Sequence, residues 1–213
     1  MSKVRCGITV SLDGYAAGPN QSKEEPLGVG GERLHEWFVE LEIFNRTHGT
    51  DYGGEVNAST PVVEESLANV GAKIMGRNMF GGGPGPWSAD PWPGWWGEDP
   101  PFHVPVFVLT HHAREPLTLS DTTFVFVTDG PESALEQARK AAGDKDVTID
   151  GGANVIQQYL AAGLIDELEL HVAPILLGGG ERLLDNVGSG VELELIRAVN
   201  APKVTHVKYR VVK

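Results

Sequence analysis

Residues 147–184 constrain the fold more than any other part of the sequence, because they place a strand, a glycine turn, a helix and a second strand in one short segment. The apolar run at 147–149 predicts a strand that ends in the Asp-Gly-Gly turn at 150–152. Apolar residues at intervals of three and four then predict a helix, and Gly163 stands where a left-handed helix stop is usual. Those apolar positions are Val155, Ile156, Tyr159, Leu160 and Leu164. Alternation over 164–173 predicts the second strand.

The turn at 150–152 has two possible roles. Two glycines at a strand end let the backbone come close to a ligand, and the following helix directs free N–H groups and the positive end of its dipole to the same point. This arrangement predicts an anion pocket, most simply for phosphate. Many α/β proteins use Gly-Gly only to turn between strand and helix, so the spacing alone leaves both roles open.

The remaining periodic segments predict the architecture. Strands are expected at 4–10, 72–75, 106–109 and 123–127, and helices at 60–69 and 131–142. Alternating segments at 191–195 and 204–211 predict a closing antiparallel hairpin. Alternation of strands and helices favours an α/β fold of three layers, in which helices cover both faces of a mostly parallel sheet. The chain length is that of one domain, residues 1–213.

Two segments fall outside this alternation of strands and helices. Residues 80–105 form an insertion rich in Trp, Pro and Gly, and a long loop with this aromatic content is expected to be a lid over a site or a subunit contact. An apolar stripe predicts a helix over 34–44, formed by Leu34, Trp37, Phe38, Leu41 and Phe44. His35 and His48, which accompany the stripe, are expected to be solvated.

Composition excludes several classes of partner. A net charge of −12 with only 17 Lys and Arg argues against nucleic acid, because a phosphate-binding face needs a basic patch. No apolar run approaches the roughly 20 residues of a membrane span, and the first strand begins without a cleavable apolar segment, so we expect no membrane and a cytoplasmic location. The single cysteine, Cys6, is expected to be buried. No histidine has a partner at zinc-site spacing, so no metal is expected.

The string DGGANVIQQYLAAGLIDELELHVAPILLGGGERLL at 150–184 resembles the C-terminal portion of the riboflavin-biosynthesis reductase domain, the C-terminal domain of the bifunctional deaminase-reductase. SLDG at 11–14 and GRNM at 76–79 resemble two further segments of this family. The family is related to dihydrofolate reductase and uses NADPH. The resemblance implies a dihydrofolate reductase-like fold, NADPH as cofactor, a small-molecule substrate, a homodimer and a cis peptide between Gly151 and Gly152.

The resemblance also implies which residues hold the cofactor. Thr9, Ala16 and Ala17 would lie against the nicotinamide, and Arg77 of GRNM would face the cofactor phosphates. Thr110 and His111 would contact the adenosine ribose and its phosphate. The other implied cofactor positions are Gly76, Asn78, Met79, Gly151, Gly152, Ala153, Asn154, Val155 and Ile156. Without the resemblance, Arg77 would read as a surface arginine after a turn.

Four residues are candidates for the chemistry. Asp150 is the candidate substrate-facing acid, because the riboflavin enzymes carry a glutamate directly before the same Gly-Gly pair. His171 falls where dihydrofolate reductase has a threonine against its pteridine, although strand alternation also fits a solvated or dimer-facing histidine. The position of Asp13 also fits a turn residue, and that of Glu64 also fits a solvated helix face. Tyr15 departs from the family, which has there a lysine that holds the substrate phosphate.

These residues favour an NADPH-dependent oxidoreductase acting on CH-NH or CH-OH groups. Hydride would pass from the nicotinamide to a C=N or C=O carbon of a small heterocycle or a similar carbonyl or imine compound. One alternative is an NADP-binding protein without turnover, since no carboxylate matches the pteridine position well. Another is a flavin-binding protein in which the tryptophan-rich insertion encloses the flavin ring.

Overall fold

A nine-stranded sheet runs through the computed structural model, which describes residues 2–50, 52–83 and 85–213. The strand order is β10-β11-β8-β1-β7-β3-β4-β6-β5. The parallel strands are β1 (Val4–Ser11), β3 (Val70–Gly76), β4 (Val106–Leu109), β6 (Thr122–Val127), β7 (Asp146–Gly151) and β8 (Glu167–Ala173). The antiparallel strands are β5 (Leu117–Leu119), β10 (Glu192–Ala201) and β11 (Val204–Val212), at the two ends of the sheet. The mostly parallel sheet and the closing hairpin are therefore confirmed.

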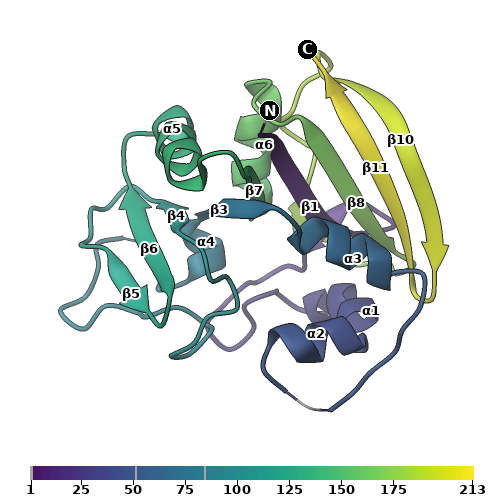
Figure 1. Cartoon of the computed structure of the whole chain (residues 1–213), viewed down its shortest axis with the longest axis horizontal. Coiled ribbons are helices and arrows are strands. Elements are labelled where there is room, and N and C mark those ends of the chain that lie inside the picture. Colours follow the sequence, from purple (N-terminus) through teal and green to yellow (C-terminus); the bar gives the residue numbers. More distant parts are fainter. Residues whose placement is uncertain (1, 51, 84) are drawn as a thin grey trace.

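Helices α5 (Pro131–Ala142) and α6 (Ala153–Ala161) cover one face of the sheet (Figure 1). Both end where the sequence predicts, since Gly143 and Gly163 take φ of 61° and 65°, which glycine adopts without steric cost. Their apolar stripes pack on β1, β3, β7 and β8 in the main core. Central residues of that core are Ile74, Leu135, Ile149, Ile156 and Leu168.

Short helices cover the opposite face beside β1, β8 and β11 (Figure 1). They are η1 (Gly31–His35), α1 (Glu36–Val39), α2 (Glu42–Thr47) and α3 (Thr60–Leu67). Helix α3 packs Val63 in a small apolar cluster with Ala201 and Val204, and beside it Glu65 pairs with Arg197 and with Lys208 of β11. Buried Glu167 and Glu169 of β8 join the same network through Lys208 and Arg197. β8 is thus covered on both faces, by the apolar core on one and by these ion pairs on the other.

The insertion at 80–105 takes the place of a helix over β3, β4 and β6. Phe80, at the end of α4 (Arg77–Phe80), and Phe124 of β6 are fully buried in a second core on this face. Trp87, Trp92, Trp96 and Phe102 of the insertion pack against that core. The insertion is therefore a structural layer of this fold, which neither the lid nor the subunit-contact reading anticipated.

The stripe predicted as one helix over 34–44 is divided among η1, α1 and α2. Leu41 separates α1 from α2, because its backbone is extended, with φ −75° and ψ 143°, and pairs with Glu55 in an isolated bridge. The apolar character of the stripe is still used, since Leu34, Trp37 and Leu41 are buried. The periodicity predicted which side chains are buried and was wrong about the continuity of the helix.

Two expectations from composition concern single features of the model. Within the described residues, no helix has both the length and the apolar surface to cross a bilayer. Cys6 is 2% exposed in β1, and burial raises the pKa of its thiol. The thiol is therefore a core group, as expected from its position in an apolar strand.

Candidate functional site

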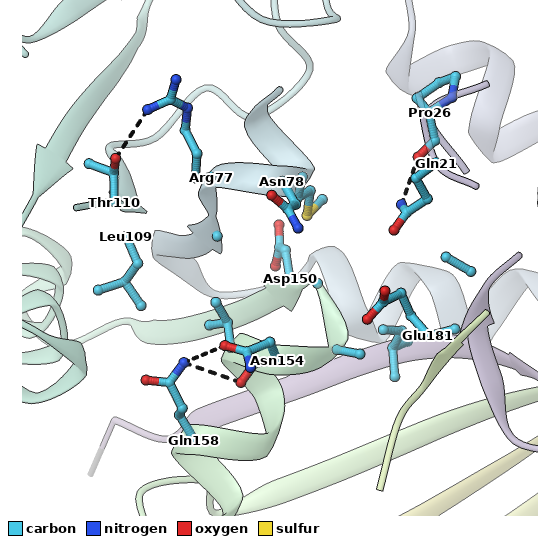
Figure 2. Close-up of a pocket in the computed structure, with 18 of the residues that line it drawn as sticks. Gln21, Pro26, Arg77, Asn78, Leu109, Thr110, Asp150, Asn154, Gln158 and Glu181 are labelled. Atoms are coloured by element: carbon cyan, nitrogen blue, oxygen red, sulfur yellow. Dashed lines mark hydrogen bonds between the residues drawn. The ribbon is translucent and has the colours of Figure 1, made fainter. Parts of the chain in front are cut away.

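A cavity of 710 Å³ opens where β1, β3, β4 and β7 end. The carboxyl ends of parallel strands lie at one edge of a sheet, so residues distant in sequence meet there. Figure 2 shows Arg77, Leu109 and Thr110 on one side of this space, and Gln21, Pro26 and Glu181 on the other. Asn78 and Asp150 lie between the two groups (Figure 2).

The cavity brings together most of the predicted site residues. Those that line it are Thr9, Ala16, Ala17, Gly76, Arg77, Asn78, Met79, Thr110, His111, Asp150, Gly152, Ala153, Asn154 and Val155. Gly151, Ile156, Asp13, Glu64 and His171 are not among its lining residues. Each local motif therefore predicted one wall of the cavity, and the sheet brings these walls together.

The Gly151–Gly152 turn has the geometry of a ligand cradle. The peptide between the two residues is cis, as the family resemblance predicted. Gly151 adopts φ +131°, which side-chain-bearing residues rarely do, whereas Gly152 has φ −72°. A Cβ placed on Gly152 would meet no atom within 4 Å, so the space in front of it is open. The first N–H groups of α6 have no intrahelical partner and lie at the same wall, which suits an anion.

Arg77 marks one end of the cavity, and Arg114 lies behind it, outside the lining. The guanidinium of Arg77 lies 3.2 Å from the ring centroid of Trp87 and donates to Thr110 Oγ1 at 3.3 Å. Arg114 lies 4.8 Å from the same ring and donates to the carbonyl of Trp92 at 2.6 Å. Burial and, to a smaller degree, the charge of Arg114 lower the pKa of Arg77. In the described part of the chain neither guanidinium has a carboxylate partner, so an anion bound here would relieve their repulsion.

Asp150 lines the middle of the cavity but does not stand alone. Its carboxylate accepts a hydrogen bond from Lys73 Nζ at 2.9 Å, with side-chain exposures of 17% and 13%. Lys73, on the neighbouring strand β3, also donates to Thr148 Oγ1 at 3.3 Å. A ligand at Asp150 therefore meets a carboxylate whose charge is balanced by an adjacent ammonium, which the sequence did not indicate.

His35 is a cavity residue that the sequence reasoning missed. It was expected to be solvated, yet it is half-buried at the end of η1 and lines the cavity. Burial lowers the pKa of its imidazole, which favours the neutral ring. No local pattern distinguishes His35 from solvated His48, because η1 is turned toward β1 and β2 (Tyr15–Ala17) by packing between distant segments.

His171 lies in a buried cluster behind the cavity wall. Its Nδ1 is 2.8 Å from Nδ1 of His206, whose Nε2 is 2.9 Å from Ser59 Oγ. Trp37 lies against both rings, at centroid distances of 5.1 and 5.0 Å. Burial is the main cause that lowers the pKa of His171 to about 3 and that of His206 to about 4. The prediction that His171 is solvated or faces a dimer partner is therefore wrong, and its ring lies outside the cavity lining.

Asp13 and Glu64 also lie away from the cavity lining. The carboxylate of Asp13 accepts hydrogen bonds from the backbone N–H groups of Leu177 and Gly178, at 3.1 and 2.7 Å. A hydrogen bond with Ser11, aided by these backbone donors, lowers the pKa of Asp13 to about 2. Glu64 is exposed on α3 and pairs with Arg46 at 3.6 Å. Asp13 therefore acts as a loop clamp in this fold, and Glu64 belongs to a solvated helix face.

One surface grouping has ligand atoms at metal-binding distances. Asp99, His103 and Asp121 each offer an atom, and these atoms lie within 4.8 Å of one another. All three residues are exposed, and His103 Nδ1 lies 2.7 Å from Asp121 Oδ1. Asp121 is 18 residues after His103, so motif spacing did not indicate the grouping. Exposed acidic groups of this kind are common without an ion.

Known proteins resemble the chain over most of its length. The family model of the RibD C-terminal domain matches residues 2–207. YyaP of Bacillus subtilis strain 168, an uncharacterized protein, is 27% identical over 104 residues, which are 46% of this chain and 55% of YyaP. A Shewanella sp. PV-4 structure whose name assigns it to riboflavin biosynthesis is 25% identical, with a TM-score of 0.64 and 99% of each chain covered.

The fold itself is also found in a more distant structure. Dihydrofolate reductase from Enterococcus faecalis, in complex with NADP(H), is 14% identical and has a TM-score of 0.58. The likeness covers 99% of this chain and 97% of that one. The predicted dihydrofolate reductase-like α/β fold is thereby confirmed.

Proposed function

Since this chain belongs to the RibD C-terminal domain family, we propose that it is a reductase that uses NADPH to reduce a small heterocyclic, carbonyl or imine substrate. The observation that carries the proposal is the open cradle at Gly152, which lies in one cavity with Arg77 and Asp150. That arrangement offers an anion site and a substrate space that are close enough for one extended cofactor. NADPH would supply hydride, and the product would be a CH-NH or CH-OH group.

Three regions of the cavity have separate tasks in this proposal. Thr9, Ala16 and Ala17 would hold the nicotinamide against the ends of β1 and β2 (Tyr15–Ala17). The N-terminus of α6 would bind the pyrophosphate through its free N–H groups. Arg77, Thr110 and His111 would bind the adenosine phosphate, and Arg114 would add a second positive charge beside Arg77.

The proton that accompanies hydride has two candidate sources. Asp150 and His35 both line the cavity, and each could pass a proton to the substrate directly or through water. The lowered pKa of His35 favours the neutral ring, in which one nitrogen accepts and the other donates a hydrogen bond, so it would position the substrate rather than act as the acid. The Asp150 carboxylate lies 2.9 Å from Lys73 Nζ, so this pair offers the substrate a hydrogen-bond acceptor with a donor beside it. We assign Asp150 the substrate-facing role.

The substrate need not be the phosphorylated pyrimidine of the riboflavin pathway. The family lysine that holds the substrate phosphate is replaced here by Tyr15. Its hydroxyl accepts a hydrogen bond from Arg182 at 3.4 Å, and the guanidinium lies 5.1 Å from the Tyr15 ring. Tyr15 does not line the cavity, so its position offers no cation to a substrate phosphate.

Purified protein tests the proposal in two steps. Calorimetric titration with NADPH measures binding, and loss of NADPH absorbance with panels of pterins, pyrimidinones, imines and ketones measures turnover. Oxidation that depends on both substrate and protein is expected, and Asp150→Asn should reduce it while leaving NADPH affinity within about twofold. Tight NADPH binding without oxidation across the panels would instead support the binding protein. A yellow protein with a flavin spectrum would support the flavin alternative.

We also propose that the chain forms a homodimer through its last hairpin. β10 is an edge strand of the sheet, and Leu193, Leu195 and Ile196 on it are 41%, 59% and 45% exposed. An exposed apolar edge is a site for association or aggregation unless a partner covers it. A second copy of the same hairpin would bury these side chains.

A further inference from the structure

A second cavity, of 730 Å³, adjoins the first and is walled by the tryptophan-rich insertion. The two cavities share Gln21, Pro26, Asn78 and Trp95, so they communicate at the end of α4. Figure 2 shows Asn78 beside Asp150, with Gln21 and Pro26 across the space from them. The passage therefore begins next to the position that we assign to the reacting part of the substrate.

Glycine backbone holds the indole walls of this second cavity in place. Gly81 has φ +89°, and a Cβ on it would lie 2.7 Å from ring atoms of Trp95, so the indole rests on the bare backbone. A Cβ on Gly82 would lie 3.0 Å from both Trp87 and Trp92. The insertion thus uses residues without side chains to bring large rings close to the chain.

Hydrogen bonds fix the same rings. Trp92 Nε1 donates to the carbonyl of Phe80 at 3.1 Å, and Trp87 Nε1 donates to the carbonyl of His112 at 2.9 Å. The rings of Trp92 and Trp95 meet at 66°, with centroids 4.7 Å apart, and so form two walls of a corner. All three tryptophans are only half-buried, which leaves ring surface available to a ligand.

The charges around the second cavity do not suit a phosphate. Lys23 and Asp90 line it with opposite signs, and both are exposed. The Lys23 ammonium already lies 5.1 Å from the ring centroid of Trp92. Among the described lining residues there is no arginine and no other lysine, whereas phosphate recognition commonly uses several such donors. The lining instead offers aromatic surface and neutral polar groups.

We propose that the second cavity binds an uncharged, planar aromatic ring that is carried by the substrate. The reacting part would lie at Asp150, and the ring would pass Asn78 and Trp95 to stack in the corner formed with Trp92. Aromatic pairs in stacked or edge-to-face geometry gain free energy beyond the apolar area they bury, which favours a flat ring over a saturated one. That one substrate carries both the reacting part and the aromatic ring rests on the proposed reductase function, whereas the binding of an aromatic ring in the second cavity does not.

Fluorine NMR of protein labelled with 5-fluorotryptophan tests the inference without cofactor or turnover. The chain has five tryptophans, whose resonances can be assigned from single Trp→Phe variants. The probes are benzyl alcohol, its saturated counterpart cyclohexylmethanol, and ribose 5-phosphate. Benzyl alcohol should shift the Trp92 and Trp95 resonances in a saturable way and leave buried Trp37 unchanged. Cyclohexylmethanol should bind several-fold more weakly, and ribose 5-phosphate should give no saturable shift of the Trp92 resonance, because Trp92 lines the second cavity and not the first.

Variants test whether the corner is the binding site. Trp92→Leu should weaken benzyl alcohol binding about tenfold, and an unchanged Trp37 resonance would show that the rest of the fold is retained. Lys140→Gln, on the exposed surface of α5 and outside both cavities, should leave the affinity unchanged. Equal binding of cyclohexylmethanol, a saturable shift of the Trp92 resonance by ribose 5-phosphate, or benzyl alcohol shifts that spare Trp92 and Trp95 would each overturn the proposal. These results do not depend on NADPH oxidation, so failure of the aromatic site and failure of the reductase proposal are distinguishable.

Discussion

Replacement of Arg77 tests how the protein would select NADPH over NADH. The phosphate that distinguishes the two cofactors is close to a dianion at neutral pH, and a guanidinium can give it charge-assisted hydrogen bonds that NADH cannot accept. Arg77 is half-buried on Trp87 and lines the cavity, so its charge is screened less than that of a surface arginine. Arg77→Ala should therefore weaken NADPH binding and leave NADH binding nearly unchanged.

The structure sets the size of this effect. A hydrogen bond to a charged group contributes roughly 1.5 to 3 kcal/mol, which corresponds to about ten- to a hundredfold in affinity. Arg114 stays beside Trp87 in the variant and keeps one positive charge near the phosphate. We therefore expect a loss near the lower end of that range, about tenfold. The preference should also decrease as salt concentration rises, because the arginines are not fully buried.

Calorimetric titrations with NADPH and NADH measure both affinities for the wild type and the variants. Arg77→Gln can still donate hydrogen bonds without the charge, so it should lose the preference as Arg77→Ala does. Arg46→Ala is the matched control, since it removes the same charge from an exposed pair with Glu64 away from the cavity. An NADPH-to-NADH affinity ratio that stays at the wild-type value in Arg77→Ala would refute the assignment of Arg77 to the phosphate.

Three further predictions concern other parts of the fold. Gly152→Val should abolish NADPH binding with little loss of stability, because the valine side chain enters open cavity space. If the variant bound NADPH normally, the cofactor site would have to lie elsewhere. The free energy of unfolding should fall as the pH decreases from about 6.5 to 4, because histidine in the unfolded chain binds protons in this range whereas His171 and His206 in the folded protein do not. Urea titrations at several pH values should show that the free energy of unfolding of His206→Gln depends on pH less steeply than that of the wild type, by about 1 kcal/mol per pH unit. Sedimentation should give a dimer that Leu195→Glu dissociates, and a 22.9 kDa species in the wild type would count against it.

Much of the architecture could be predicted because the sequence carries its local signals. Backbone hydrogen bonding gives helices and strands fixed periods, so apolar spacing indicated α5, α6 and the final hairpin. Positive φ at Gly143 and Gly163 explains why those helices end where glycine stands. Cavity residues were also predictable wherever a short motif carries them, as at Gly152 and Arg77, since each lies at the end of a parallel strand.

The burial of polar side chains could not be predicted in this way. Glu167, Glu169 and His171 alternate with apolar residues along β8, which is the pattern of a strand with one solvated face. In the structure they are buried, because β10 and β11 bring Arg197 and Lys208 onto that face and α3 covers them with Glu65. Partners that lie dozens of residues away leave no periodic signal in the strand itself.

The sequence alone determined the main strands of the sheet, helices α5 and α6, their order and the glycine turn at the cavity wall, because these depend on backbone conformation and on neighbours within a few residues. Tertiary structure decided that His35 faces the cavity, that Lys73 accompanies Asp150, and that the insertion at 80–105 forms a layer with a second cavity. Each of these follows from contacts between segments far apart in the chain. Such contacts depend on how side chains of particular shape and charge fill the shared space, and local spacing does not specify that.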